Sequence, residues 1–302
     1  MSDILIEEEL PPPVVRGRSL WEEAHRRLMR NPMAVASLYV VAILVLIAAF
    51  GPMLWVHKAH IIYPDRVGIG PTLQHLHILG TDTEGRDMLA RLMIGLRISL
   101  LVGAAATVVA LFIGVSYGAI AGFFGGALDE AMMRFVDVLY AIPFIFFVIV
   151  LMTVVQVESP EARLLLIFMA IGAVEWLTMA RIVRGQTLAL RRKEFVEAAR
   201  AAGAKPLEIV FRHIVPNVLG PVVVFATLNI PVIILSESFL SFIGLGVQEP
   251  LASLGSLLSR GKDQIGTAPW MLWSPAMLML VTLLALNFLG DGLRDALDPK
   301  DR

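Results

Sequence analysis

Residues 33–55 read MAVASLYVVAILVLIAAFGPMLW, a run that contains no charged side chain. A transmembrane helix needs about 20 predominantly apolar residues to cross a hydrocarbon core of about 30 Å. Five later stretches have a similar, predominantly apolar character, at residues 98–124, 135–156, 163–183, 218–244 and 270–290. We therefore predict an all-α polytopic membrane protein with six transmembrane helices.

The composition supports this fold class. The chain has 302 residues, of which 57% are hydrophobic and only 17% charged, whereas soluble domains carry about 25% charged residues. A net charge of −1 gives no electrostatic footprint for nucleic acid. The absence of cysteine excludes disulfides and thiolate metal sites.

The sidedness of the membrane segments follows from lysine and arginine, which concentrate in cytoplasmic loops. Most of the 25 basic residues fall on one side if the N-terminus is cytoplasmic. We therefore expect both termini and the polar segment 190–217 in the cytoplasm, and the loops 56–97 and 245–269 outside. The acidic, proline-rich start has no basic segment followed by an apolar one, so a cleavable signal peptide is not expected.

These boundaries divide the chain into four expected parts. Residues 1–32 form a cytoplasmic tail, and residues 33–97 hold the first span and the outer loop. Residues 98–292 form the transmembrane core, which includes the segment 190–217. Residues 293–302 form a second cytoplasmic tail.

The outer loop contains LGTDTEGRDMLARLMIGLRISL at residues 79–100. Thr81 and Glu84 have the spacing of a capping box. The residues that follow show helical periodicity, with apolar side chains at Leu89, Leu92, Met93 and Leu96. We expect an amphipathic helix that lies on the outer membrane surface and leads into the second span. A simple interfacial entry helix is an equally good interpretation.

The segment 194–217, EFVEAARAAGAKPLEIVFRHIVPN, interrupts the apolar runs. Its first part places one helical face together, at Phe195, Ala198, Ala199 and Ala202. Gly203 is expected to end this helix, and Pro206 to begin a second one. Pro216 is expected to close that second helix just before the fifth span.

Two interpretations of this helix pair are open. The helices could lie on the membrane surface, or they could dock into a groove on a partner protein. An alanine face offers little apolar area for insertion into lipid, at about 25 cal/mol per Å². The composition therefore favours docking.

Within this segment, residues 197–216 resemble the signature of ABC-importer permeases. The matching positions are Glu197, Ala198, Ala199, Gly203, His213 and Pro216. In that family the segment docks onto a cytoplasmic ATP-hydrolysing subunit. The resemblance implies that these residues couple the chain to such a subunit.

Three other stretches are similar to the dipeptide, oligopeptide and nickel branch of that family. They are the ending of the fifth span, ESFLSFIGLGVQEP at 237–250, the C-terminal NFLGDGLRDALDP at 287–299, and the outer-loop signature. The outer-loop positions are Gly80, Thr81, Asp82, Gly85, Arg86 and Asp87. The chain departs from the branch at Glu249 and Leu254, where proline and tryptophan are expected.

The resemblance implies a non-catalytic permease subunit of an ATP-driven importer in a bacterial or archaeal plasma membrane. Its implied partners are a second permease chain, two cytoplasmic ATP-binding subunits and an extracytoplasmic substrate-binding protein. ATP and Mg would be held by those subunits, and no cofactor is expected in this chain. The substrate, whether peptide, glutathione-like compound, nickel chelate or sugar, is left open.

Two acidic residues fall within predicted spans, Glu175 and Glu237. A charge near the membrane centre costs about 2.5–3.5 kcal/mol on insertion scales, so it usually faces a cavity or a partner. Each residue is a candidate for the wall of a translocation path or for a packing contact. For Glu237 a packing contact is the favoured interpretation. For Glu175 the packing contact and the translocation path are equally good interpretations.

Four histidines of the outer loop, His57, His60, His75 and His77, have spacings that could bind a metal. We expect them to face solvent instead, with no metal site. An ion-coupled secondary transporter would need more ionisable residues in its spans, and an intramembrane enzyme would need a catalytic group at one depth. Both alternatives are less favoured.

Overall fold

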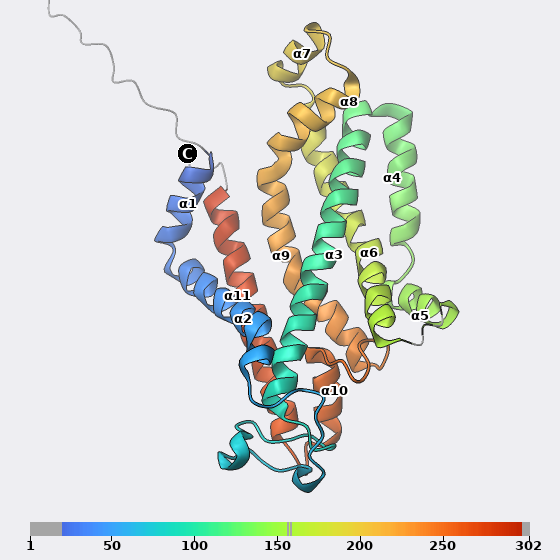
Figure 1. Cartoon of the computed structure of the whole chain (residues 1–302). Coiled ribbons are helices and arrows are strands. Elements are labelled where there is room, and N and C mark those ends of the chain that lie inside the picture. The colour runs from blue at the N-terminus through green and yellow to red at the C-terminus, as the bar shows by residue number, and fades with distance from the viewer. Residues whose placement is uncertain (1–19, 156, 158, 298–302) are drawn as a thin grey trace, which may run out of the picture.

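The computed structural model describes residues 20–155, 157 and 159–297, and within them the regular secondary structure is helical. Long helices run side by side in a bundle (Figure 1). Five helical segments are long and apolar enough to cross a membrane: α2 (Pro32–Leu54), α3 (Met88–Phe124), α6 (Pro160–Leu190), Pro206–Phe242 and α11 (Trp270–Leu297). The predicted all-α architecture is confirmed.

The stretch expected to be the third span, 135–156, is not one straight helix. It is covered by α4 (Gly126–Tyr140) and α5 (Phe144–Val154), which are bent by 77° with respect to each other. The bend lies next to Pro143, whose ring fixes φ and whose missing N–H interrupts helical hydrogen bonding. The number of spans is therefore five, or six if this bent pair counts as one.

Helices α3 and α6 are packed very closely at the centre of the bundle. A stripe of glycines at Gly114, Gly118 and Gly122 on α3 faces α6. A Cβ atom on Gly118 would lie 2.3 Å from the carbonyl oxygen of Ala180. Small residues at such spacing let two membrane helices approach backbone to backbone, and α3 and α6 are in extensive contact here.

The bundle has two distinct ends (Figure 1). One end carries α1 (Leu20–Arg30), α7 (Glu194–Ala201) and the C-terminal end of α11. The opposite end carries the outer loop and α10 (Leu254–Asp263), a helix within the predicted loop 245–269. The two described chain ends and the segment 190–217 thus share one end, as the predicted topology requires.

The predicted tails are partly helical. Residues 20–30 of the expected tail 1–32 form α1, and residues 293–297 of the expected tail 293–302 complete α11. Residues 1–19 and 298–302 lie outside the described residues. Ala24 and Leu28 of α1 are buried together with Ala296 of α11, so the helical parts of the two segments pack against each other.

The predicted capping box and surface helix of the outer loop are wrong. Helix α3 begins at Met88, and its N-cap is Asp87, whose carboxylate accepts a 2.8 Å hydrogen bond from the N–H of Ala90. From there α3 runs without interruption to Phe124. Leu92 and Leu96 are buried in the protein, so the periodic stripe faces other helices instead of lipid. The expectation that this helix leads into the second span is confirmed.

Candidate functional site

The segment 194–217 forms a short helix, a tight turn and the start of a long helix. Gly203 has φ +82°, a left-handed conformation that favours glycine, and it ends α7 as predicted. Its N–H donates to the carbonyl of Arg200, and the N–H of Ala204 donates to Ala199. Pro206 stands at the first turn of α8 (Pro206–Ile209), where its missing N–H costs nothing.

The exposed face of α7 differs from the predicted alanine stripe. Val196 and Ala199 point into the bundle and pack in the cluster that contains Phe123, so the assignment of Ala199 to the free face was wrong. Ala198, Ala202 and Phe195 are exposed. Glu197 is exposed as well, so the free surface combines small side chains with a carboxylate.

Pro216 does not close the second helix. Helix α8 continues through a π-helical turn, Val210–Ile214, into α9 (Val215–Phe242). The wider π turn accommodates a proline, which cannot donate a backbone hydrogen bond. His213 lies in this turn, half-buried, and its carbonyl oxygen accepts a 2.6 Å hydrogen bond from the Asn217 side chain. The turn after α7 is thereby joined to a membrane span by unbroken helix.

Glu237 on α9 is fully buried, and its carboxylate accepts hydrogen bonds from serine hydroxyl groups. It accepts hydrogen bonds from Ser99 of α3 at 3.1 Å and from Ser241 at 2.7 Å. Ser99 also accepts the N–H of Leu254, at the start of α10. This carboxylate therefore ties α3, α9 and α10 together, an arrangement that fits a packing contact.

Glu175 on α6 has a different environment. Its side chain is half-buried, and it accepts a 2.7 Å hydrogen bond from Asn229 of α9. Among the described residues, Asn229 is its one hydrogen-bond partner. A carboxylate with free acceptor capacity between two spans can bind a passing cationic or hydrogen-bonding group.

The outer-loop residues that resemble the family signature come together as a structural unit. Gly80 and Gly85 have φ +75° and +80°, and a Cβ on Gly85 would lie 2.3 Å from the carbonyl oxygen of Tyr63. The Thr81 hydroxyl accepts the N–H of Ile69 at 2.9 Å. These positions fold the loop over the end of α3.

A buried charge network lies beneath this loop. Arg86 and Arg91 both donate to the carboxylate of Asp82 at 2.8 Å. Arg91 also donates to Glu249 at 2.6 Å, and Arg260 of α10 pairs with the same carboxylate at 2.7 Å. Sequence reasoning missed Arg91, Glu249 and Arg260 as partners, because residues from both outer loops form the network.

The network lowers the pKa of its acids. Burial alone would raise the pKa of Asp82, but the backbone N–H of Arg86 and the charges of Arg91 and Arg86 outweigh it and lower the pKa. Burial likewise opposes the shift at Glu249, and the charge and hydrogen bond of Arg91, with the charge of Arg260, lower its pKa. Both carboxylates are therefore held ionised.

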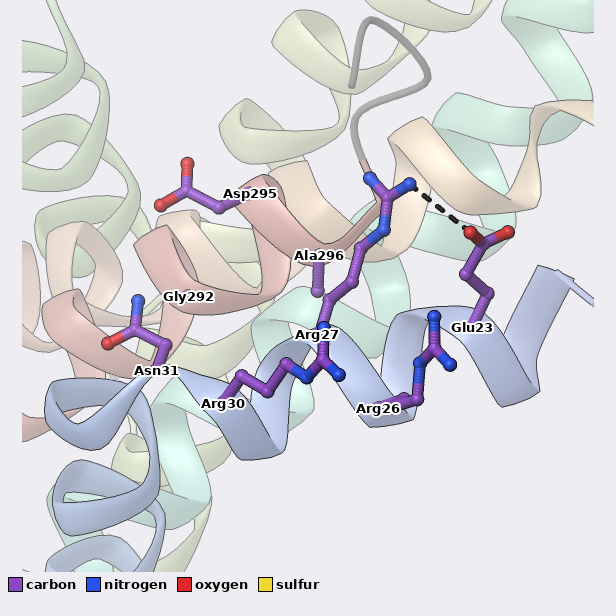
Figure 2. A pocket seen from close by; sticks show the side chains of 8 residues that line it. All are labelled: Glu23, Arg26, Arg27, Arg30, Asn31, Gly292, Asp295 and Ala296. Atoms are coloured by element: carbon purple, nitrogen blue, oxygen red, sulfur yellow. Dashed lines mark hydrogen bonds and ion pairs between the residues drawn. The ribbon is translucent and has the colours of Figure 1, made fainter. Parts of the chain in front are cut away.

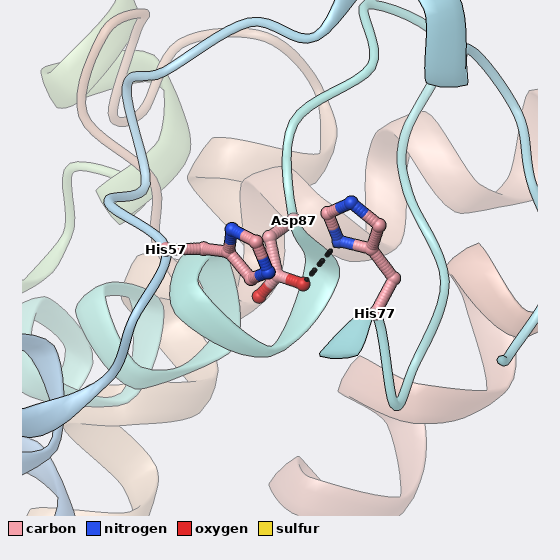
Figure 3. Close-up of side chains that lie close together, drawn as sticks. All are labelled: His57, His77 and Asp87. Atoms are coloured by element: carbon pink, nitrogen blue, oxygen red, sulfur yellow. Dashed lines mark hydrogen bonds and ion pairs between the residues drawn. The ribbon is translucent and has the colours of Figure 1, made fainter. Parts of the chain in front are cut away.

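Two of the outer-loop histidines do not face solvent. The rings of His57 and His77 are buried, 6% and 1% exposed, and they stack with centroids 4.4 Å apart. Asp87 lies beside them (Figure 3). The expectation of solvent-facing side chains is wrong for this pair, whereas His60 and His75 are exposed.

Each ring nitrogen of the histidine pair already has a partner. His57 contacts the Tyr63 hydroxyl at 3.0 Å and the carbonyl of His75 at 2.7 Å. His77 contacts Asp87 at 2.9 Å, and its Nε2 lies 3.4 Å from Arg66 Nη1. The other Asp87 oxygen accepts from Trp55 and Ala90. These residue types can hold a metal, but here they complete a hydrogen-bonded core.

The bundle with five to six apolar spans defines a polytopic membrane protein. Residues 114–302 match the family of binding-protein-dependent transport system inner membrane components, and residues 19–66 match the N-terminal TM domain of oligopeptide transport permease C. The chain belongs to the family of inner membrane components of binding-protein-dependent transport systems. The resemblance seen in the sequence is confirmed.

Similar proteins match nearly the whole chain. The oligopeptide transport system permease protein OppC is 50% identical over 288 residues in Haemophilus influenzae, covering 95% of this chain and 91% of that one. OppC of Escherichia coli is 53% identical over 292 residues, covering 95% and 94%. The dipeptide transport system permease protein DppC of Bacillus subtilis is 41% identical over 285 residues, covering 94% and 87%.

A solved structure shows a similar fold. A chain of the MetNI methionine ABC transporter, in an inward-facing conformation, aligns with a TM-score of 0.54 and 18% identity. The alignment covers 67% of this chain and 94% of the MetNI chain. The fold of the aligned part is therefore similar to that of this transporter chain.

Proposed function

We propose that the chain is the permease subunit of an ATP-driven importer of oligopeptides in a bacterial inner membrane. The observation that carries this proposal is the connection of the exposed α7 surface to a membrane span through the helix Pro206–Phe242. Family membership and the names of the similar permeases support the importer class and the peptide substrate.

The partners follow from the two ends of the bundle. We assign the end that carries α1, α7 and the end of α11 to the cytoplasm, where two ATP-binding subunits would hold ATP and Mg. Glu197, Ala198, Gly203, His213 and Pro216 belong to the proposed coupling segment. A second permease chain would complete the pore, and an extracytoplasmic binding protein would deliver substrate to the opposite end.

Coupling would work through rigid-body movement. ATP binding favours one arrangement of the ATP-binding subunits, and a ligand shifts a two-state equilibrium by its differential affinity for the two states. Because unbroken helix follows the turn after α7, a displacement of that segment is transmitted into α9. Helix α9 carries Asn229, the partner of Glu175, so the movement reaches the proposed translocation path.

The test is copurification of the complex. The chain would be tagged and isolated in mild detergent as wild type, as Glu197→Arg and as the matched charge reversal Glu161→Arg. Glu161 is an exposed residue in the first turn of α6, and α6 begins at the end of the bundle opposite α7 (Figure 1). We expect ATP-binding subunits and a second permease with the wild type and with Glu161→Arg, and loss of the ATP-binding subunits with Glu197→Arg. Isolation of the wild-type chain alone, with uptake intact, would instead support an ion-coupled transporter.

A further inference from the structure

The end of the bundle that carries α7 also has a basic cavity between α1 and the end of α11. The cavity has a volume of about 510 Å³ and is shown in Figure 2. Its lining residues are Glu23, Arg26, Arg27, Arg30, Asn31, Gly292, Asp295 and Ala296. Three arginines from little more than one helical turn thus face the same space.

Packing fixes the position of this cavity. Ala24 and Leu28 of α1 are buried in a cluster with Ala296 of α11 and Ala34 of α2. A Cβ on Gly292 would lie 2.3 Å from the Cβ of Ala34, so α11 and α2 are in close contact beside α1. Because its apolar face is held in this way, α1 presents its arginine face at a defined place.

The charges in the cavity are not balanced within the described part of the chain. Arg27 pairs with Glu23 at 3.3 Å, whereas Arg26 and Arg30 have no ion-pair partner among the described residues. Asp295 lies across the cavity on α11 (Figure 2). The site therefore has an excess of guanidinium groups, which bind phosphate oxygens in a planar, two-donor geometry.

The surface next to the arginines is apolar and belongs to a membrane span. Met29 and Met33 are 46% and 54% exposed, and Met33 begins the exposed apolar side of α2. An amphipathic helix with arginines beside such a surface lies at the boundary of headgroups and acyl chains. A ligand with an anionic head and an apolar tail fits both parts.

We propose that Arg26 and Arg30, with Arg27 beside them, bind the phosphate headgroup of an anionic phospholipid whose acyl chains lie along α2. The location of this lipid in the cytoplasmic leaflet rests on the orientation given under the proposed function. That leaflet is negatively charged, and each nearby arginine contributes about 1 kcal/mol to attraction. The bound lipid would hold α1 against α2 and α11.

The experiment measures lipid retention by the purified complex. Native mass spectrometry would count phosphatidylglycerol and phosphatidylcholine molecules retained by the wild type, by Arg26→Gln with Arg30→Gln, and by Arg26→Lys with Arg30→Lys. The control is Arg134→Gln, an exposed arginine of α4. We expect phosphatidylglycerol binding by the wild type and the control, weaker binding by the lysine variant, which keeps the charges but loses the two-donor geometry, and binding weaker by about tenfold or more in the glutamine variant.

Equal phosphatidylglycerol binding by the wild type and the glutamine variant would overturn the proposal. It would also be overturned if the wild type retained as much phosphatidylcholine as phosphatidylglycerol. Displacement of the lipid by millimolar inorganic phosphate would show a site for free phosphate instead. Copurified ATP-binding subunits, counted in the same spectra, report separately on the proposed function. Loss of lipid without loss of those subunits is the result expected for the glutamine variant.

Discussion

The guanidinium of Arg91 donates a 2.6 Å hydrogen bond to the carboxylate of Glu249, although 158 residues separate the two. Arg91 is 2% exposed and lies in the first turn of α3, whereas Glu249 lies in the loop before α10. The pair therefore joins the two outer loops at the end of the bundle that we assign to the binding protein.

Replacing Glu249 with alanine should destabilise this end of the protein. The change leaves the buried Arg91 without one of its two carboxylate partners. Removal of one member of a buried pair costs about 3–5 kcal/mol, and partial exposure of Glu249 reduces this to about 2 kcal/mol. Thermal unfolding in detergent measures the loss. Glu130→Ala, in a pair that is 74% and 76% exposed, should have no measurable effect, and an equal effect of both changes would contradict the prediction.

Acid should open the same loops. The pKa values of Asp82 and Glu249 are lowered in the folded protein, so the unfolded state binds more protons and stability rises with pH. The contribution is complete above the unfolded values of about 4 and is lost as pH falls through the lower folded values. Hydrogen exchange of residues 55–87 should be constant from pH 7 to 5, after correction for intrinsic rates, and accelerate below 4. Glu249→Gln should weaken this acid dependence.

The close contact between α3 and α6 predicts a sharp difference between two glycines. Gly118→Ala should destabilise the protein by about 1–3 kcal/mol, because the added Cβ meets the carbonyl of Ala180 and forces the helices apart. Gly185→Ala on α6 is the control, since a Cβ there has no neighbour within 4 Å. Unfolding temperatures of the two variants check this. Equal temperatures would mean that the helices separate without cost.

The spans could be predicted from sequence because lipid imposes a local rule, the length of an apolar run. The bend beside Pro143 could not, since proline permits several helix angles and packing selects one. The burial of His57 and His77 depends on the folding of a long loop. The free face of α7 was assigned wrongly because Ala199, a member of the alanine stripe, is buried with Val196 in the cluster that contains Phe123.

The proposed coupling positions could be named from the sequence for a different reason. Their pattern resembles a family signature. The pairing of Glu249 with Arg91, by contrast, brings together residues far apart in the sequence and depends on the folded structure. The partner of Glu175 could not be predicted from the sequence either. Its place within a span could be seen in the sequence, but its partner Asn229 lies on another helix.

Glu175 provides the test of the translocation path. Glu175→Gln keeps the size of the side chain and a hydrogen-bond acceptor for Asn229 but removes the charge. If the carboxylate attracts the amino terminus of a passing peptide, uptake should fall about tenfold, a loss of about 1.4 kcal/mol, without loss of assembly. N-acetylated peptides should be affected less. Uptake by the reconstituted complex, with copurification as the assembly measure, checks both.

Glu237→Gln is the matched control, because Glu237 is enclosed by serine hydroxyls. Its replacement puts an amide N–H group where the carboxylate accepts, so we expect a lower unfolding temperature and equal losses for free and N-acetylated peptides. The two substitutions should therefore differ: Glu175→Gln should change the preference between free and N-acetylated peptides, and Glu237→Gln should lower stability. Wild-type uptake of every peptide by Glu175→Gln would remove Glu175 from the path and leave the Asn229 contact as helix packing.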